Sequence, residues 1–469
     1  MMMRRREFVV GCLSTAVAGE AFGHSCDVPS DVGAYYAAYL ETVAARVRAN
    51  AQTCDTGFWF LTDPHVKANH RKSGRLCADL IARTGLRRVL CGGDLPVAFA
   101  DGHTTDKAAV DFACDTFRGG WVDPIRAAGG ALYCAKGNHD FTIRHSADAA
   151  DEHVGFTYPG ATARRFIVGE WTQPDVVANP ADPTGCYYYV DDARAKIRYV
   201  VADTTDTERA GDVPWGVAYG VHDTQLAWLA EHALGTVPSG CDVVVMHHIP
   251  VAGVVGNADD VETFANLRDL LEGYQNRRVV RIGGRSFDFA SAHGRILLDI
   301  TGHHHAERQT FQNGILHVTE PCDAYYGNYI NGSAPWCGDL PRKKGGTVYE
   351  QTFDAVQIER SRKYVRFTRV GGGQDRVIHL SPRIVRVGET VRFEPSFFAG
   401  PTTFGCYDGD CVSFPPNPQN RWSPLVAYKT TFAEISPTGV LTAHRPGPVM
   451  ALAMDAHLNK EIFPVQVIA

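Results

Sequence analysis

The sequence predicts an α/β fold in which two facing mixed sheets are flanked by helices, with a small all-β unit at the carboxyl end. Three observations predict it. Strand-like apolar runs alternate with helical patterns up to residue 376, five of those runs end in a polar motif, and from Ile378 onward apolar residues alternate between Pro- and Gly-rich turns. The chain has 469 residues, 45% of them hydrophobic, so it is long enough for more than one domain.

The first segment has the features of an export signal. Residues 1–6 are short and cationic, Arg5-Arg6-Glu7-Phe8 matches the twin-arginine pattern, and residues 8–18 are apolar but too short to cross a bilayer. We therefore expect residues 1–26 to be a twin-arginine-type signal segment and the mature protein to be periplasmic or secreted. A cytoplasmic enzyme with a basic start is the alternative.

Helices and strands then alternate along the chain. The predicted helices, in which apolar residues recur at helical spacing, are residues 35–49, 73–82, 106–117, 223–234 and 260–274. The predicted strands that lead into polar motifs are residues 58–61, 89–91, 131–134, 243–246 and 296–300. This alternation is typical of an α/β domain, which we place at residues 27–376.

Five polar motifs follow those strands. They are Asp63-Pro64-His65, Gly92-Gly93-Asp94, Gly137-Asn138-His139-Asp140, His247-His248 and Gly302-His303-His304-His305. Side chains at the carboxyl ends of neighbouring strands converge on one crevice, so residues far apart in sequence can meet around metal ions. Oxygen and nitrogen donors without thiolate favour two divalent metal ions drawn from manganese, iron and zinc. Two such ions would acidify a water and hold the oxygens of an in-line displacement at phosphorus.

In this order the motifs resemble the pattern DxH, GD, GNH[DE], strand-terminal His and GHxH of the calcineurin-like metallophosphoesterase family. The resemblance covers roughly residues 55–376 and implies a four-layer α/β sandwich that hydrolyses phosphate esters by attack of a metal-bridging hydroxide. The metal ligands that it implies are Asp63, His65, Asp94, Asn138, His247, His303 and His305.

The same resemblance assigns individual roles. It implies that Asp94 bridges the two ions and that His139 protonates or steadies the leaving oxygen, oriented by Asp140. Adjacent residues of a strand face opposite ways, so only one of His247 and His248 can ligate from regular geometry, and we favour His247.

The substrate is less constrained than the metal site. Purple acid phosphatases place a metal-binding Tyr three residues after the GD aspartate, where this chain has Val97. We therefore expect no ferric tyrosinate site, and a small-molecule phosphodiester is slightly favoured over a monoester. The alternative is a surface-associated binding protein that uses the same fold as a scaffold and has little turnover.

The carboxyl-terminal segment, residues 377–469, changes character. It has alternating apolar residues and no helical period, and residues 432–442 with residues 447–456 resemble bacterial Ig-like domains. The resemblance implies a small β-sandwich and a possible association with the cell surface. Every motif residue lies before residue 376, so the sequence alone predicts that turnover does not need this segment.

Charge and cysteine content narrow the class of partner. The net charge is −6, the sequence pI is about 6.3 and no basic run follows the amino terminus, so we expect a small-molecule phosphate ester and no nucleic acid as partner. No stretch approaches the ~20 apolar residues of a transmembrane helix. The close pairs Cys322 with Cys337 and Cys406 with Cys411 lie in polar loops, where disulfides would form in an oxidising compartment.

Overall fold

The computed structural model describes residues 34–65, 69–96, 98–99, 105–144, 154–206, 220–251, 261–305, 307–324, 345–400, 402–407 and 430–469. The predicted signal segment, Val97, Cys337 and Cys411 lie outside the described residues. Within the described part of the chain, no helix is both long enough and apolar enough to cross a membrane.

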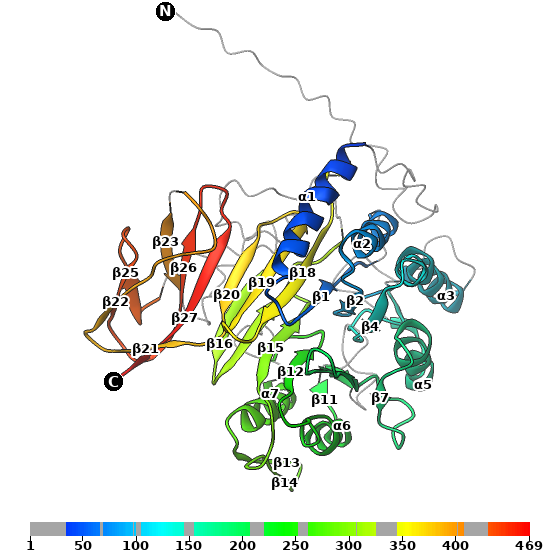
Figure 1. Ribbon diagram of the computed structural model, residues 1–469. Helices are drawn as coiled ribbons and strands as arrows, with labels where there is room; N and C mark the ends of the chain where they lie inside the picture. The colour runs from blue at the N-terminus through cyan, green and yellow to red at the C-terminus, as the bar shows by residue number, and fades with distance from the viewer. Residues whose placement is uncertain are drawn as a thin grey trace, which may run out of the picture.

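Two large sheets form the centre of the molecule (Figure 1). The first has the order β23-β26-β27-β20-β19-β18-β1-β2-β4, with β21 paired to β27, and the second has the order β16-β17-β15-β12-β9-β8-β7. The strands of the first sheet are β1 (Thr56–Leu61), β2 (Arg88–Cys91), β4 (Ala131–Cys134), β18 (Thr352–Glu359), β19 (Tyr364–Gly371), β20 (Arg376–His379), β21 (Arg383–Arg386), β23 (Thr403–Tyr407), β26 (Gly447–Met454) and β27 (Lys460–Ile468). Those of the second are β7 (Val177–Ala178), β8 (Tyr188–Asp192), β9 (Ile197–Val201), β12 (Asp242–Met246), β15 (Ile296–Thr301), β16 (Arg308–Gln312) and β17 (Ile315–Thr319).

Shorter elements complete the fold. The small sheets contain β3 (Ala98–Phe99), β5 (Thr142–Arg144) and β6 (Val154–Thr157); β10 (Thr205–Asp206) and β11 (Gly220–Val221); β13 (Val279–Ile282) and β14 (Arg285–Asp288); and β22 (Thr390–Arg392), β24 (Ala433–Ile435) and β25 (Val440–Ala443). The helices are α1 (Ala34–Asn50), α2 (His70–Thr84), α3 (Asp106–Phe117), α4 (Asp123–Ala127), α5 (Gly160–Arg164), α6 (Asp223–Trp228) and α7 (Val261–Gln275). Three π-helical segments continue or link them: η1 (Arg118–Val122), η2 (Arg165–Trp171) and η3 (Leu229–Leu234).

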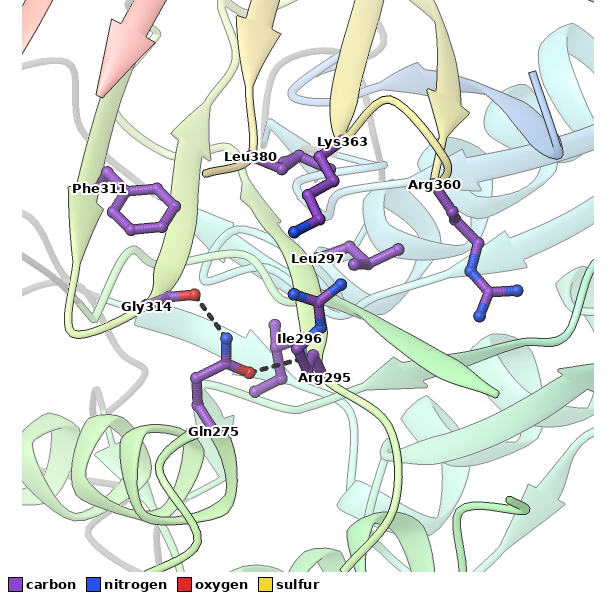
Figure 2. A pocket seen from close by; sticks show the side chains of 9 residues that line it. All are labelled: Gln275, Arg295, Ile296, Leu297, Phe311, Gly314, Arg360, Lys363 and Leu380. Carbon is purple, nitrogen blue, oxygen red and sulfur yellow. Dashed lines mark hydrogen bonds between the residues drawn. The ribbon is translucent and has the colours of Figure 1, made fainter. Parts of the chain in front are cut away.

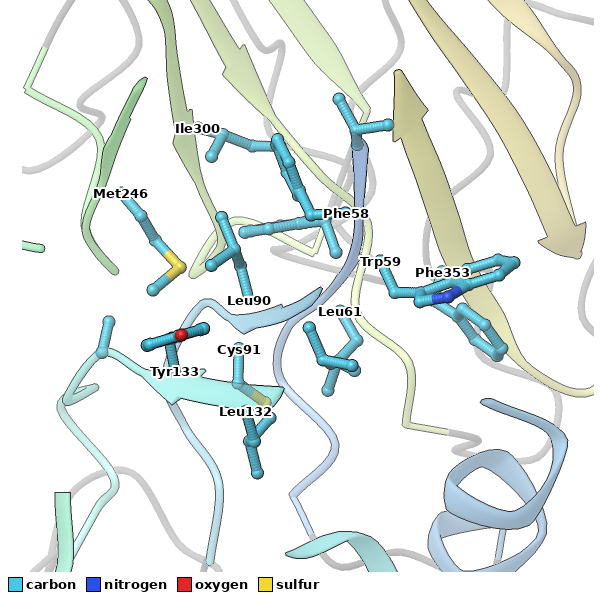
Figure 3. Packing of buried hydrophobic residues seen from close by; sticks show 14 of the residues in the cluster. Phe58, Trp59, Leu61, Leu90, Cys91, Leu132, Tyr133, Met246, Ile300 and Phe353 are labelled. Carbon is cyan, nitrogen blue, oxygen red and sulfur yellow. The ribbon is translucent and has the colours of Figure 1, made fainter. Parts of the chain in front are cut away.

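Alternation along the strands divides the apolar residues between two faces. In β1, Phe58 packs edge-on against Tyr199 of the second sheet, with ring centroids 5.8 Å apart, whereas Trp59 faces the other way and donates to Leu86 O. Figure 3 shows Phe58, Leu90, Met246 and Ile300 on one side of β1, in the core between the sheets, and Trp59 with Phe353 on the other side. The two sheets therefore face each other across one continuous apolar core.

Helices cover the outer faces of both sheets. Helices α1 and α2 lie beside the first sheet, and α6 and α7 lie beside the second (Figure 1). Side chains of α1 and α2 join the core of the first sheet, and side chains of α6 and α7 pack with β12 in a second apolar cluster. The order of layers is helices, sheet, sheet, helices. The predicted four-layer α/β sandwich is confirmed.

Strand direction brings the motifs together. In the first sheet β1, β2 and β4 are parallel, and in the second β9, β12 and β15 are parallel. All five motifs follow strands of these two groups, so they emerge at carboxyl ends, where an α/β sheet presents its binding crevice.

The carboxyl-terminal segment continues the first sheet. The predicted boundary after residue 376 falls inside β20, which pairs antiparallel with β19 on one side and parallel with β27 on the other. A three-stranded sheet, β22-β25-β24, contributes to a separate apolar cluster that includes Leu441, Val449 and Phe463. The Ig-like assignment stays a prediction, but the described strands join this segment to the α/β domain by main-chain hydrogen bonds.

The last residue of β19, Gly371, gives a test of how closely β18 and β19 approach each other. Gly371 has φ +92°, and a Cβ there would lie 1.8 Å from Gln351 O, whereas Gly388 has φ +85° with no atom within 4 Å of its Cβ position. We expect Gly388→Ala to lower the free energy of unfolding by about 1–2 kcal/mol through backbone strain. Gly371→Ala adds a main-chain clash and should cost roughly 3–5 kcal/mol. Urea denaturation of the two variants measures the difference, and equal losses would contradict the close approach of β18 and β19.

Candidate metal centre

The five motif loops meet between the two sheets. Asp63, Asp94 and Asn138 follow strands of the first sheet, whereas His248 and His303 follow strands of the second. The His248 ring crosses from one sheet to the other, since its Nδ1 lies 2.8 Å from Gly92 O. The structure therefore brings together donor atoms of residues that lie more than 200 positions apart in the sequence.

One group of donors contains Asp63, His65 and His305. The two imidazole Nε2 atoms are 3.1 Å apart, and Asp63 Oδ1 lies 3.2 Å from His305 Nε2 and 3.6 Å from His65 Nε2. The ligand atoms all lie within 4.8 Å of one another, close enough to surround a single cation.

A second group contains Asp63, Asp94 and His248, with Asn138 and His303 beside it. Asp94 Oδ1 lies 3.3 Å from His248 Nε2, and Asn138 Oδ1 lies 3.1 Å from His248 Nε2 and 2.9 Å from His303 Nδ1. Oxygen and nitrogen donors from both sheets therefore also meet at a second position.

Asp94 faces both groups. Its Oδ2 lies 3.7 Å from His65 Nε2 in the first group, and its Oδ1 faces His248 in the second. Asp63 also belongs to both groups. The geometry agrees with a bridging role for Asp94 and places Asp63 in an equally central position.

The donor set fits divalent cations because the buried Asp63 carboxylate has one oxygen without a well-formed hydrogen bond to any described residue. Asp63 Oδ2 accepts from Thr62 Oγ1 at 2.6 Å and from His303 N at 3.0 Å. Asp63 Oδ1 is buried and makes no hydrogen bond to any described residue, although imidazole nitrogens of His65, His248 and His305 lie 3.2–3.9 Å away. Burying a carboxylate oxygen is costly unless hydrogen bonds or positive charge compensate it, and a cation shared with the surrounding imidazoles would supply that compensation.

Backbone strain is concentrated at the same residues. The non-glycine motif residues with positive φ are Asp63 (52°), His65 (48°), Asp94 (53°), His303 (70°) and His305 (54°). Each costs about 1–2 kcal/mol for a residue with a Cβ, so the surrounding structure has to impose the conformation. Strain of this kind gathers at binding and catalytic sites, which supports a functional role for these loops.

Two motif glycines allow the loops to pack closely. A Cβ on Gly137 would lie 2.3 Å from Asp94 Oδ1, and a Cβ on Gly302 would lie 1.9 Å from Thr62 Oγ1 and 2.5 Å from Asp63 Oδ2. The space that a side chain would fill is occupied by the candidate ligands or by the hydroxyl that holds them.

The carboxylates create a strongly negative environment. Burial lowers the pKa of His248, but Asp94 and Asp63 outweigh this effect and raise it to about 9. For His303, burial and the neighbouring His248 lower the pKa to about 3. The site therefore stabilises positive charge between Asp63 and Asp94, which is where a metal cation would be bound.

The structure corrects the preference for His247 as a ligand. His247 is fully buried on the opposite side of the chain, with Nε2 2.8 Å from Asp299 Oδ1 and Nδ1 2.9 Å from Ile249 O. His317 Nδ1 contacts the other Asp299 oxygen at 2.7 Å. His248 takes the place predicted for His247 in the cluster.

Alternation along β12 explains the correction. Val244 and Met246 point into the core between the sheets, whereas Val243 and Val245 point toward α6 and α7. His248 continues the first series. This alternation is visible in the sequence. It identifies His248 as the ligand only when the face of β12 that meets the first sheet is known.

His139 and Asp140 have different roles in the loop. His139 Nε2 lies 3.8 Å from Asp94 Oδ2, and its side chain is 19% exposed, so it lies at the rim of the cluster. Asp140 acts on the backbone, since its two oxygens accept from Leu95 N and Gly137 N. These contacts fix the backbone of the loop that carries His139. An orienting role of Asp140 toward the His139 imidazole stays a prediction.

A separate pocket lies at the other end of the strands. It is lined by Arg295, Ile296 and Leu297 at the start of β15, whereas the metal motif follows the end of β15 (Figure 2). Arg295 and Lys363 point toward each other in this view, and Arg360 turns away to pair with Asp242 at 2.8 Å. This pocket is distinct from the metal centre.

The two adjacent histidines provide a matched test. His248→Ala should weaken manganese binding by more than roughly 100-fold, the upper end of the range for residues that only support a ligand. His247→Ala should keep the metal stoichiometry but lower stability by about 3 kcal/mol, because it removes one partner of the buried Asp299. Elemental analysis and denaturation of both variants distinguish the roles, and loss of metal only in His247→Ala would reverse the assignment.

Known proteins share little sequence with this chain. No protein-family model matches the chain, and no curated protein matches its sequence. Among solved structures, a dimetal phosphatase from Danio rerio is 15% identical, with a TM-score of 0.46 over 70% of this chain and 100% of that chain. A predicted phosphoesterase from Streptococcus pneumoniae is 10% identical, with a TM-score of 0.25 over 69% of this chain and 96% of that chain. Phosphopantetheinyl hydrolase from Mycobacterium tuberculosis is 11% identical, with a TM-score of 0.28 over 58% of this chain and 91% of that chain.

Proposed function

We propose that this protein is a dinuclear-metal phosphoesterase. The observation that carries the proposal is the Asp63 carboxylate, which keeps one buried oxygen without a hydrogen bond to any described residue and faces imidazoles of both donor groups. Asp94 presents one oxygen to each group. Such an arrangement suits two cations better than it suits a packed protein interior.

Each metal has its own set of candidate ligands. Asp63, His65 and His305 would hold one ion, Asn138, His248 and His303 the other, and Asp94 would lie between them. When bound, divalent manganese, iron or zinc would polarise the phosphoryl oxygens and supply hydroxide at neutral pH. The intact donor set argues against the alternative of a binding scaffold with little turnover.

His139 is suited to act on the leaving oxygen. Its imidazole is at the rim, partly exposed, while its backbone N–H donates to Asp94 Oδ1 at 2.8 Å. The protein thereby ties the position of the proton donor to the position of the central carboxylate. A proton on Nε2 could pass to the departing alkoxide or phenoxide, which is general acid catalysis.

The proposal extends to the substrate class and to the cellular location of the protein. A small-molecule phosphodiester is slightly favoured over a monoester, because Val97 stands where purple acid phosphatases have a metal-binding Tyr. We also propose that the protein acts after export, which rests on Arg5-Arg6-Glu7-Phe8.

Metal dependence provides the first test of this function. We expect the purified protein to bind about two divalent ions per chain, to lose hydrolysis on chelation and to regain it with manganese, zinc or iron. Bis(p-nitrophenyl) phosphate, p-nitrophenyl phosphate and cyclic nucleotides separate diester from monoester activity. Asp94→Asn should lower both metal occupancy and rate. Chelator-insensitive activity in protein without stoichiometric metal would refute the proposal.

The second test concerns the general acid. His139→Ala should retain both metals but reduce turnover by roughly 10²–10⁴-fold for esters with poor leaving groups. The loss should shrink for p-nitrophenyl esters, whose leaving group needs little protonation. His457→Ala, which removes an exposed imidazole in the β26–β27 turn, is the control and should not change either rate. Equal losses for good and poor leaving groups would contradict the acid role.

A further inference from the structure

Six charged side chains form a buried cluster, here called the ionic cluster, next to the last metal motif. Each side chain is at most 4% exposed. The cations are Arg369, Arg376 and Lys460, and the anions are Glu307, Glu320 and Asp354. Buried charges persist only where partners compensate them, so the geometry of this cluster is tightly constrained.

Two arginines of the first sheet, Arg369 in β19 and Arg376 in β20, bind all three anions. Arg369 lies 2.9 Å from Asp354, 3.1 Å from Glu307 and 3.3 Å from Glu320. Arg376 reaches the same three carboxylates at 3.0, 3.3 and 2.6 Å. Gly373 leaves room for this arrangement, since a Cβ there would lie 2.2 Å from Arg369 Nη1.

The third cation comes from the carboxyl-terminal segment. Lys460 is the residue of β27 that pairs directly with Arg376 of β20, which brings two like charges side by side. Glu307 lies between them, with Oε1 2.7 Å from Lys460 Nζ and Oε2 3.3 Å from Arg376 Nη1. The pairing of β20 with β27 is thus tolerated because Glu307 bridges the two cations.

Glu307 is the carboxylate that reaches all three cations. Its Oε2 lies 3.1 Å from Arg369 Nη2 and 3.3 Å from Arg376 Nη1, and its Oε1 lies 2.7 Å from Lys460 Nζ. Loss of Lys460 or of the Glu307 charge would therefore leave a buried charge without one of its partners.

Two segments of the chain connect the ionic cluster to the metal centre. Glu307 lies two residues after His305. Glu320 begins the segment that runs along the first motif, where Asp323 N donates to Thr62 O at 2.8 Å and Ala324 N donates to Asp63 O at 3.2 Å. The backbones on both sides of the metal centre are thus tied to the cluster.

We propose that Lys460 is a positioning residue for the metal centre, holding Glu307 so that the loop with His303 and His305 keeps its metal-binding conformation. The inference rests on the proposed function, because it takes these histidines as metal ligands. Both have positive φ, a conformation that the surrounding structure has to impose. On this proposal the carboxyl-terminal segment contributes to metal binding, contrary to the expectation from the sequence that turnover does not need it.

The test compares metal affinity with stability. Manganese binding is measured by titration calorimetry, and unfolding by thermal denaturation, for Lys460→Met and Glu307→Gln in the full chain. We expect Lys460→Met to weaken manganese binding by about 10-fold, the lower end of the range for residues that support ligands, and Glu307→Gln to shift it in the same direction. Glu307→Gln keeps the side-chain shape, so it serves if Lys460→Met does not fold.

Leu441→Ala is the matched control. Leu441 is fully buried in the apolar cluster of the carboxyl-terminal segment, so its truncation should lower the melting temperature and leave manganese affinity unchanged. The proposal is overturned if folded Lys460→Met and Glu307→Gln bind manganese as the wild type does. It is also overturned if Leu441→Ala weakens binding equally at the same loss of stability. Wild-type protein that binds manganese but hydrolyses no ester would instead refute the proposed function.

Discussion

The structure of the metal centre depends on one buried carboxylate. Asp63 has one oxygen held by Thr62 and the backbone of His303, and another that receives no hydrogen bond from any described residue. Keeping that oxygen away from water is unfavourable unless a cation is bound. The strained loops and the closely packed Gly137 and Gly302 all bring donors toward this position.

The architecture makes such an arrangement rigid enough to persist. Ligands come from both sheets, and the apolar core between the sheets fixes how far apart the two sets of strand ends lie. Contacts such as that between Phe58 and Tyr199 therefore help to fix the positions of the ligands, although these two residues are not ligands themselves. A site built on strand ends of a packed core can hold several residues in costly backbone conformations.

The metal centre and the ionic cluster are both buried and polar, but their charges are arranged differently. In the metal centre, the buried carboxylates of Asp63 and Asp94 lie among imidazole nitrogens that could share a metal cation with them. In the ionic cluster, three cations face three carboxylates at 2.6–3.3 Å. The first arrangement is suited to binding a cation and the second to fixing the chain. Glu307, close to His305, links them in sequence, and Lys460 brings the carboxyl-terminal segment into the same system.

Apolar periodicity and strand-terminal motifs are local patterns, so the α/β class, the layers and most of the candidate site could be predicted before the fold was known. The predicted residues Asp63, His65, Asp94, Asn138, His303 and His305 are ones that the structure brings together. The choice between His247 and His248 required the packed fold, because it depends on which face of β12 meets the other sheet. Likewise, only strand pairing between β20 and β27 showed that the final segment extends the first sheet and supplies Lys460. Such pairings join residues about 80 positions apart, and no local pattern specifies them.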